Sequence, residues 1–344
     1  MKASVFSEYG PPDVLHLSEI SAPVPGDREV LVRVHATSVN FGDTMVRNFR
    51  AVTPRQFHMP MLFWLIGRAQ FGFRKPRAHV LGSDFAGQVA AVGPKVTRFE
   101  VGDRVFGFRG ARMGAYAEYL CAPERGAMTQ IPETLTYEEA ATVPYGAMMA
   151  WGLLRKIRLE PQQRVLVIGA SGGIGPALVQ LAVSQFDAEV TGVCSTPNVD
   201  YVRSLGATDV VDYTTHDFLE SNETYDVIID ILGKSSFADC KHTLAARGKL
   251  IYVSFKMREI GQMLWTSISS SRKVRCVVID EKAEDLEAIA AFINAGKLRP
   301  LVGKTFPLEQ AAEAHRHAAS EAKTGPIVIT IPELGTHKAT SVPA

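Results

Sequence analysis

Two patterns of apolar and polar residues follow one another along the chain, and the change falls near residue 126. In the first part, short stretches such as 29–37 alternate apolar and polar residues, with turn residues around Gly10, Pro25 and Gly93. This pattern predicts a β-rich domain, either a barrel or a sandwich. In the second part, short apolar runs alternate with stretches of helical periodicity, which predicts a doubly wound parallel sheet.

The second pattern also predicts where individual elements lie. The run at 165–168 is wholly apolar, as expected for a strand that is covered on both faces. Further strands are predicted at 189–193, 209–211, 226–230, 249–253 and 326–331. Helices are predicted at 137–154, 199–205, 235–246, 285–295 and 308–319.

A glycine-rich turn follows the strand 165–168 and has the spacing Ala170-x-Gly172-x-x-Gly175. It leads into an amphipathic helix with Pro176 in its first turn, where a missing N–H does no harm. Gly172 would let the backbone approach a phosphate, and Gly175 would let the helix pack closely on the strand. The free N–H groups of the helix start suit a pyrophosphate, although an ordinary strand–turn–helix remains the alternative.

The end of the second strand indicates which dinucleotide binds. NAD-binding units place an Asp or Glu there, about 20 residues after the glycines, to accept hydrogen bonds from the ribose 2′-hydroxyl. Here the position holds Ser195 and Thr196, whose hydroxyl groups suit a 2′-phosphate. NADPH is therefore predicted in preference to NADH, while the alternative is that both residues only cap the helix that begins near Pro197.

Composition narrows the class of protein further. The 344 residues are 46% hydrophobic and 21% charged, with a formal net charge of +1, which predicts two globular domains and no nucleic-acid or membrane partner. The start of the chain has no signal-peptide pattern, so a cytoplasmic location is expected. Four cysteines lie far apart and are expected to be isolated thiols: Cys121, Cys194, Cys240 and Cys276.

The segment 44–83 interrupts the β-rich pattern. It contains no Asp or Glu but seven basic residues, interleaved with Met, Phe and Trp: Arg47, Arg50, Arg55, Arg68, Arg74, Lys75 and Arg77. One interpretation is a lid over a hydrophobic pocket, with a cationic collar for an anionic part of the substrate. The alternative is a surface insertion packed on the barrel, with its basic side chains simply solvated.

Several short motifs together resemble the zinc-independent, quinone-oxidoreductase-like branch of the medium-chain dehydrogenase/reductase superfamily. Their order and spacing carry the resemblance over nearly the whole length. They are Tyr9-Gly-Pro-Pro-Asp-Val-Leu, Ser38-Val-Asn-Phe-Gly-Asp43, Gly82-Ser-Asp-Phe-Ala-Gly87, Phe99-Glu-Val-Gly-Asp-Arg-Val105, Gly114-Ala-Tyr-Ala-Glu-Tyr119, Ala140-Ala-Thr-Val-Pro144 and Val211-Asp-Tyr213.

The resemblance implies a GroES-like β-barrel domain made from both chain ends, 1–125 and 266–344, with a Rossmann domain at 126–265 between them. It implies a homodimer and NADPH bound in the cleft between the domains. The cofactor-binding residues are then expected to be Ala170, Ser171, Gly172, Gly173, Ile174, Ser195, Thr196, Tyr213, Leu232 and Lys323.

The resemblance also locates the catalytic site. Asn40, Asp43 and Tyr145 are expected beside the nicotinamide, where Asn40 and Asp43 position the turn and Tyr145 is a candidate proton donor or pocket wall. Zinc alcohol dehydrogenases of this fold have a Cys where Asn40 stands and His-Glu where Ser83-Asp84 stand. Without thiolate or imidazole ligands here, a metal-free site is predicted.

The chemistry expected of such a site is hydride transfer from NADPH to a quinone or to an α,β-unsaturated carbonyl compound. Alternatives are an enoyl-thioester reductase, which the basic segment would favour, and a secondary alcohol dehydrogenase. A further alternative, from another class, is an NADPH-binding protein with a redox-sensing role and little catalysis.

Overall fold

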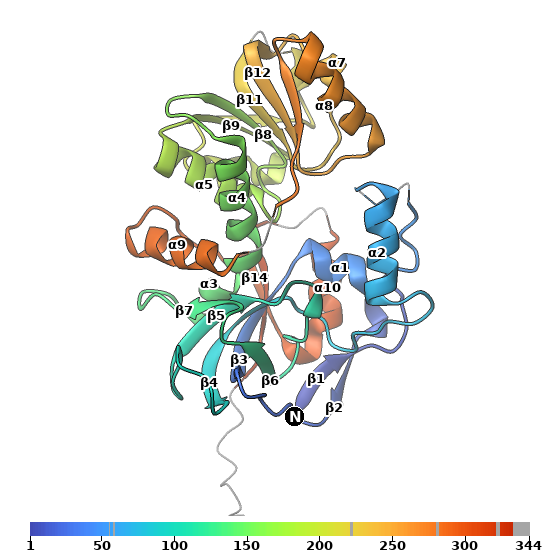
Figure 1. Cartoon of the computed structure of the whole chain (residues 1–344), viewed down its shortest axis with the longest axis vertical. Helices are drawn as coiled ribbons and strands as arrows, with labels where there is room; N and C mark the ends of the chain where they lie inside the picture. The colour runs from blue at the N-terminus through green and yellow to red at the C-terminus, as the bar shows by residue number, and fades with distance from the viewer. Residues whose placement is uncertain (55, 58, 221–222, 280–281, 321–323, 333–344) are drawn as a thin grey trace, which may run out of the picture.

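Two sheets lie towards opposite ends of the long axis of the molecule, one mainly antiparallel and one wholly parallel (Figure 1). The computed structural model describes residues 1–332 apart from 55, 58, 221–222, 280–281 and 321–323. Within these residues, no helix is long and apolar enough to cross a membrane.

The antiparallel domain is built around the long strand β3. Its sheet has the order β14-β15-β3-β4-β5-β7, and β6 also pairs with β3. Val30, Val32 and Val34 of β3 are buried, as the alternating pattern predicts. The strands are β3 (Glu29–Val39), β4 (Asp84–Val92), β5 (Arg104–Phe108), β6 (Tyr119–Pro123), β7 (Ala127–Gln130), β14 (Lys304–Pro307) and β15 (Ile327–Thr330).

Both ends of the chain build this domain, as the resemblance implies. Strand β15, near the C-terminus, pairs antiparallel with β3, with Ile327 opposite Val39. At the other end of the chain, β1 (Lys2–Val5) pairs with β2 (His16–Glu19). The helices of this domain are α1 (Phe41–Arg47), α2 (Met61–Phe71) and α10 (Ala311–Ala318), with short 3-10 turns η1 (Pro12–Val14), η2 (Gly110–Arg112) and η5 (Leu308–Gln310).

The second sheet is parallel and has the order β10-β9-β8-β11-β12-β13. This is the doubly wound order, in which the direction of chain progression reverses between β8 and β11. Ligands of such folds bind outside the carboxyl ends of the strands at that reversal. The strands are β8 (Arg164–Ile168), β9 (Glu189–Cys194), β10 (Asp209–Asp212), β11 (Tyr225–Asp230), β12 (Leu244–Tyr252) and β13 (Lys273–Cys276).

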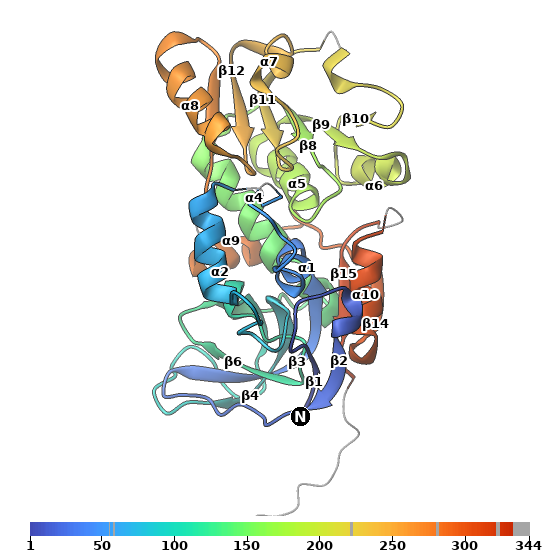
Figure 2. The same cartoon turned by 90° about the vertical axis from the view of Figure 1, so that its right-hand side faces the viewer.

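Helices cover the parallel sheet and connect the two domains. Helix α4 runs from the barrel towards the parallel sheet in both views (Figures 1 and 2). The elements are α3 (Tyr137–Ala141), α4 (Pro144–Ile157), α5 (Gly175–Phe186), α6 (Val199–Ser204), α7 (Phe237–Cys240), α8 (Met257–Ser269) and α9 (Ala283–Asn294), with 3-10 turns η3 (Thr196–Asn198) and η4 (Phe218–Glu220).

Two of the predicted helices were wrong in extent. The stretch 137–154 is two helices because Pro144, which lacks an N–H, begins a new one. The predicted helix 235–246 is helical only over Phe237–Cys240. Its Leu-Ala-Ala end favours a helix locally, but Leu244 pairs with Tyr225 and begins β12, so sheet pairing overrides the local preference.

The predicted domain limit at residue 265 falls inside α8. This helix leads to β13, which pairs parallel with β12, so the parallel sheet continues to Cys276. A helical crossover of this kind returns the chain to the same sheet edge. The exact division of the chain into domains stays a prediction.

Candidate functional site

Asn40 and Asp43 lie at the N-terminus of α1 and hold each other in a capping box. The Asp43 backbone N–H donates to Asn40 Oδ1 at 3.2 Å, and the Asn40 N–H donates to Asp43 Oδ2 at 3.0 Å. Asp43 Oδ1 also accepts from the Gly82 N–H at 3.1 Å. The Asn-x-x-Asp spacing therefore fixes the helix start against the loop that precedes β4.

The Asn40 side chain is occupied with structural contacts. Its Nδ2 atom donates to Ser83 Oγ at 2.6 Å and to Asp84 Oδ2 at 3.0 Å. Asn40, Ser83 and Asp84 are the three positions at which the resemblance implies Cys, His and Glu in zinc alcohol dehydrogenases. They do lie together here, but as one amide, one hydroxyl and one carboxylate that bond to each other. The described residues contain no group of three His, Cys, Asp or Glu arranged to hold a metal ion, and a metal-free site stays a prediction.

Asp84 joins this cluster to the second domain. Its Oδ2 accepts from Ser38 Oγ as well as from Asn40, and its Oδ1 accepts from the Tyr145 backbone N–H at 2.9 Å. Tyr145 stands in the first turn of α4, whose free N–H groups attract a carboxylate. One buried side chain thus connects β3, α1 and α4.

The carboxyl of Asp43 lies deep in the protein. Burial raises its pKa to about 8, and the nearby charge of Asp84 adds to this effect. Burial and the charges of the nearby Asp43 and Asp84 raise the pKa of the Tyr116 hydroxyl. A carboxyl in this environment holds its proton to higher pH than an exposed Asp.

A buried chain of polar groups leads away from Asp43. The Tyr116 hydroxyl lies 3.0 Å from His315 Nε2, and Arg47 Nη1 lies 2.8 Å from His315 Nδ1. Because a guanidinium only donates, Nδ1 accepts and the proton of the neutral ring is on Nε2. Burial and the charge of Arg47 lower the pKa of His315 to about 3, so the ring is neutral. The chain connects Arg47 in α1 with Tyr116 through His315 in α10.

The Tyr145 ring lies at the boundary between the two domains. It packs against Phe108 of β5, with ring centroids 6.0 Å apart. A Cβ atom added to Gly173 would stand 3.3 Å from Tyr145 Cε1, so the ring also touches the glycine-rich turn. The next residue, Gly146, has room for no side chain because its Cβ would stand 2.4 Å from the Gly173 carbonyl oxygen. Helix α4 therefore packs directly on the glycine-rich turn.

The glycine-rich turn has the geometry that a pyrophosphate requires. Gly169 adopts a φ of +93°, and a Cβ atom on Gly175 would stand 2.4 Å from the Gly169 and Ala170 carbonyl oxygens. No side chain caps the start of α5, and Gly173 is exposed. The free N–H groups of α5 thus lie beside an open, side-chain-free turn that fits a dinucleotide pyrophosphate. The predicted contacts of Ala170, Ser171, Gly172, Gly173 and Ile174 with the cofactor stay predictions.

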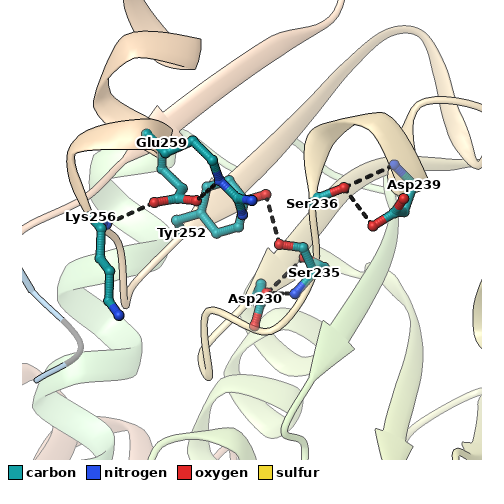
Figure 3. A network of polar contacts seen from close by, with 8 residues as sticks. Asp230, Ser235, Ser236, Asp239, Tyr252, Lys256 and Glu259 are labelled. Atoms are coloured by element: carbon teal, nitrogen blue, oxygen red, sulfur yellow. Dashed lines mark hydrogen bonds and ion pairs between the residues drawn. The ribbon is translucent and has the colours of Figure 1, made fainter. Parts of the chain in front are cut away.

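Leu232 lies on the other side of the chain reversal. A Cβ atom on Gly169 would stand 3.1 Å from Leu232 Cγ, so this side chain covers the start of the glycine-rich turn. Asp230, fully buried at the end of β11, holds the loop (Figure 3). Its carboxylate accepts from the N–H groups of Leu232, Gly233 and Ser235 at 2.8–2.9 Å. The sequence analysis predicted Leu232 but missed Asp230.

The same loop is tied to its neighbours by further polar contacts. Ser235 Oγ donates to Asp230, and the Tyr252 hydroxyl donates to the Ser235 carbonyl oxygen at 3.2 Å (Figure 3). Lys256 is the N-cap residue of α8, and its backbone N–H donates to the Glu259 side chain at 2.8 Å. The loop at the predicted cofactor crevice is therefore preorganised by the ends of β11 and β12.

The predicted 2′-phosphate subsite contains a carboxylate that the sequence analysis missed. Thr196 Oγ1 donates to Asp212 Oδ2 at 2.6 Å, and the Thr214 hydroxyl donates to Asp212 at 2.7 Å. These hydrogen bonds lower the pKa of Asp212, so it is anionic. Ser195 and Tyr213 flank the same place, and the Tyr213 N–H donates to the Cys194 carbonyl oxygen at 3.0 Å. A 2′-phosphate here would lie close to a negative charge.

Two basic residues, Arg203 and Lys323, are the sequence candidates for a positive partner of the 2′-phosphate. Arg203 lies 3.2 Å from Asp200 in an exposed ion pair. Lys323 lies outside the described residues. Asp212 is visible in the sequence as part of Val211-Asp-Tyr213, but it lies at the end of β10, whereas the fingerprint rule points only to the end of β9. His315 had no signal at all, because nothing in its local pattern connects it with Tyr116.

A barrel domain from both chain ends, an inserted doubly wound domain and a glycine-rich crevice define a two-domain dehydrogenase/reductase. Comparisons with known proteins agree. Residues 26–133 match the family described as "Alcohol dehydrogenase GroES-like domain", and residues 205–329 match "Zinc-binding dehydrogenase".

Three individual proteins show the similarity over the full length. The quinone oxidoreductase of Sus scrofa is 30% identical, covering 96% of this chain and 98% of that protein. The mitochondrial NAD(P)H oxidoreductase RTN4IP1 of Homo sapiens is 29% identical, with 96% and 89% covered. The solved quinone oxidoreductase from Coxiella burnetii has a TM-score of 0.81 at 26% identity, covering 96% of this chain and 99% of that one. The chain therefore belongs to the quinone-oxidoreductase-like family of medium-chain dehydrogenase/reductases, and it is an oxidoreductase.

Proposed function

We propose that this protein is an NADPH-dependent, zinc-free reductase of quinones or α,β-unsaturated carbonyl compounds. The observation that carries the proposal is the contact of Tyr145 with Gly173, because it brings the Asn40–Asp84 cluster beside the turn that fits a pyrophosphate. The names of the porcine and human relatives support a nicotinamide cofactor and a quinone acceptor.

When bound, NADPH supplies a hydride to the β-carbon of an enone or to a quinone. For an enone, the electron pair of the double bond moves to the carbonyl oxygen, and a proton taken up afterwards completes the saturated ketone. Both Nδ2 hydrogens of Asn40 are used by Ser83 and Asp84, so Asn40 acts as a positioning residue. The Tyr145 hydroxyl or solvent is then the proton donor, since Tyr145 lies at the turn.

The choice of NADPH rests on the end of β9, where Ser195 and Thr196 stand in place of an acid. The carboxylate of Asp212 opposes it, because it would lie near the 2′-phosphate. The Thr196 hydroxyl already donates to Asp212, so we propose that a contact from the Ser195 hydroxyl outweighs this repulsion and that NADPH remains preferred. Measuring the oxidation of NADH in parallel with that of NADPH tests the cofactor preference directly.

The test is oxidation of NADPH in the presence of 1,4-quinones, medium-chain enals and medium-chain enones. Turnover of one of these classes, unchanged after dialysis against a chelator, is expected. Tight NADPH binding without turnover of any of them would overturn the proposal and favour a binding or redox-sensing role. Loss of activity with the chelator would contradict the zinc-free site.

A second candidate is an enoyl-thioester reductase. It is favoured by the exposed basic residues of the segment 44–83, which suit an anionic carrier group: Arg50, Arg74, Lys75 and Arg77. Comparing an enoyl-CoA with the free enone of the same chain length decides between them. A much higher kcat/KM for the thioester would select this candidate, and oxidation of secondary alcohols alone would select an alcohol dehydrogenase.

A further inference from the structure

Helix α2 has large apolar residues on most of its circumference, with Arg68 and Gln70 as its polar side chains, yet only one face is packed on the protein. Trp64, Gly67 and Phe71 face the barrel domain. On the opposite face four large apolar side chains are exposed: Met61 62%, Leu62 65%, Leu65 43% and Ile66 53%. A helix with apolar residues on most sides is normally buried on those sides. We therefore expect the exposed face of α2 to contact a partner.

The orientation of α2 is fixed by specific contacts. Gly67 lies so close to Phe49 that an added Cβ would stand 2.9 Å from Phe49 Cζ. Trp64 Nε1 donates to the Val52 carbonyl oxygen at 2.8 Å, and Arg68 Nη2 donates to the Phe73 carbonyl oxygen at 2.6 Å. These contacts hold the other side of α2 against the barrel domain, so the exposed apolar face points outwards.

Exposed basic residues flank α2 on both sides in the sequence. The segment 44–83 has no acidic residue, and Arg50, Arg74, Lys75 and Arg77 are exposed in it. Phe73, 55% exposed, stands among these cations. The near-neutral net charge of the whole chain, which argued against a membrane partner, hides this local excess.

A second exposed apolar surface lies next to α2. Helix α8 is on the same side of the molecule in both views (Figures 1 and 2). It exposes Leu264, Trp265 and Ile268. Met59, just before α2, packs against the same core cluster as Ile260 and Met263 of α8.

We propose that the exposed face of α2, flanked by its cations, docks on an anionic lipid surface. At 11 residues α2 is too short to span a bilayer, but such a helix lies in the interface with its apolar side chains among the acyl chains. Lys and Arg beside it attract anionic headgroups. A second copy of this chain fits less well, because two-fold pairing of the face would bring its cations together.

The experiment is co-sedimentation of the full chain with vesicles of phosphatidylcholine, with and without about 30% phosphatidylglycerol. Binding to the anionic vesicles that weakens with salt is expected. The double substitution Leu62→Ser and Ile66→Ser should reduce binding by at least about 10-fold. Arg74→Glu and Lys75→Glu should each reduce it by about 5-fold or more.

Matched controls are Val24→Ser and Val101→Ser, which remove equally exposed apolar side chains elsewhere on the barrel domain. They should bind as the wild type does, and all variants should keep its thermal unfolding midpoint. The proposal is overturned by a wild type that does not bind, or by equal binding of the α2 variants. Two other partners of this face would also overturn the proposal, namely a second copy of the chain and an acidic peptide. In either case vesicles are not bound, and the α2 substitutions abolish self-association or binding to polyglutamate.

Discussion

Asp84 accepts hydrogen bonds from Ser38, Asn40 and the first turn of α4, and so ties the catalytic loop to the inter-domain helix. Replacing it with Asn puts an amide N–H where two acceptors are needed. We expect Asp84→Asn to lower the free energy of unfolding by about 2–3 kcal/mol, measured by urea denaturation, and to reduce kcat/KM.

Asp27→Asn is the matched control for that substitution. Asp27 pairs with Lys95 at 2.6 Å on the surface, with both side chains 60% exposed, so its loss should change stability by less than about 0.5 kcal/mol. Equal losses of unfolding free energy in the two variants would show that Asp84 does not tie the catalytic loop to α4.

Asp43 should make stability depend on pH. Its pKa is raised from 3.8 to about 8, so the folded chain holds a proton that the unfolded chain releases, and stability falls as pH rises through this range. The pKa of His315 is lowered from 6.5 to about 3, which has the opposite effect below pH 6.5. The two effects offset each other between about pH 4 and 6.5. The net result is a loss of folding stability as the pH rises from 6.5 to 8.

Asp43→Asn should remove this loss, which is at most about 1.4 kcal/mol per pH unit. Urea unfolding across the window measures it. A variant with the same slope as the wild type would place the titrating group elsewhere.

Asp212 should weaken NADPH binding in the wild type. Removing its charge with Asp212→Asn is expected to tighten NADPH by roughly 5- to 10-fold and to leave NADH nearly unchanged, because only NADPH carries the 2′-phosphate. Fluorescence titration gives both dissociation constants. Asp209→Asn, at the other end of β10, is the control, and equal tightening of both cofactors would exclude a charge effect on the phosphate.

At the scale of elements, the close approach of α4 to the glycine-rich turn has a sharp consequence. A Cβ atom on Gly146 would stand 2.4 Å from the Gly173 carbonyl oxygen, and the obstacle is backbone. Gly146→Ala should displace the turn, weaken NADPH binding and lower the unfolding free energy by about 1–3 kcal/mol, as thermal unfolding with and without NADPH will show.

Gly261 in α8 provides the comparison, since an added Cβ there meets nothing within 4 Å. Gly261→Ala should be neutral or stabilise the chain by up to about 1 kcal/mol, as expected for an exposed helix position. A Gly146→Ala variant that behaves like Gly261→Ala would contradict the packing described here.

The elements also show what the sequence could predict. The buried run 165–168, the alternation in β3 and the turn between Ala170 and Gly175 have strong local patterns, and each forms the expected element. Residues 244–246 were misassigned because their helix preference is local, whereas the pairing of Leu244 with Tyr225 of β11 is not. Asp84 and His315 owe their roles to contacts between segments far apart in sequence, which no local pattern records.

At the scale of the whole molecule, the two domains meet at a few defined places. Tyr145 touches both β5 and the glycine-rich turn, and Met59 reaches the core cluster of the parallel sheet. Met59 thus brings part of the segment 44–83 against the second domain. Closure of this segment over substrate, and the homodimer, stay predictions.

The most direct test of the proposed chemistry follows the transferred atom. The purified protein, dialysed against a chelator, is given a conjugated enone and NADPH that carries deuterium on its hydride-donating carbon, and the product is examined by mass spectrometry and NMR. We predict one deuterium on the β-carbon of the saturated ketone. Tight NADPH binding with no turnover of enone or quinone, or a product without deuterium, would contradict the account.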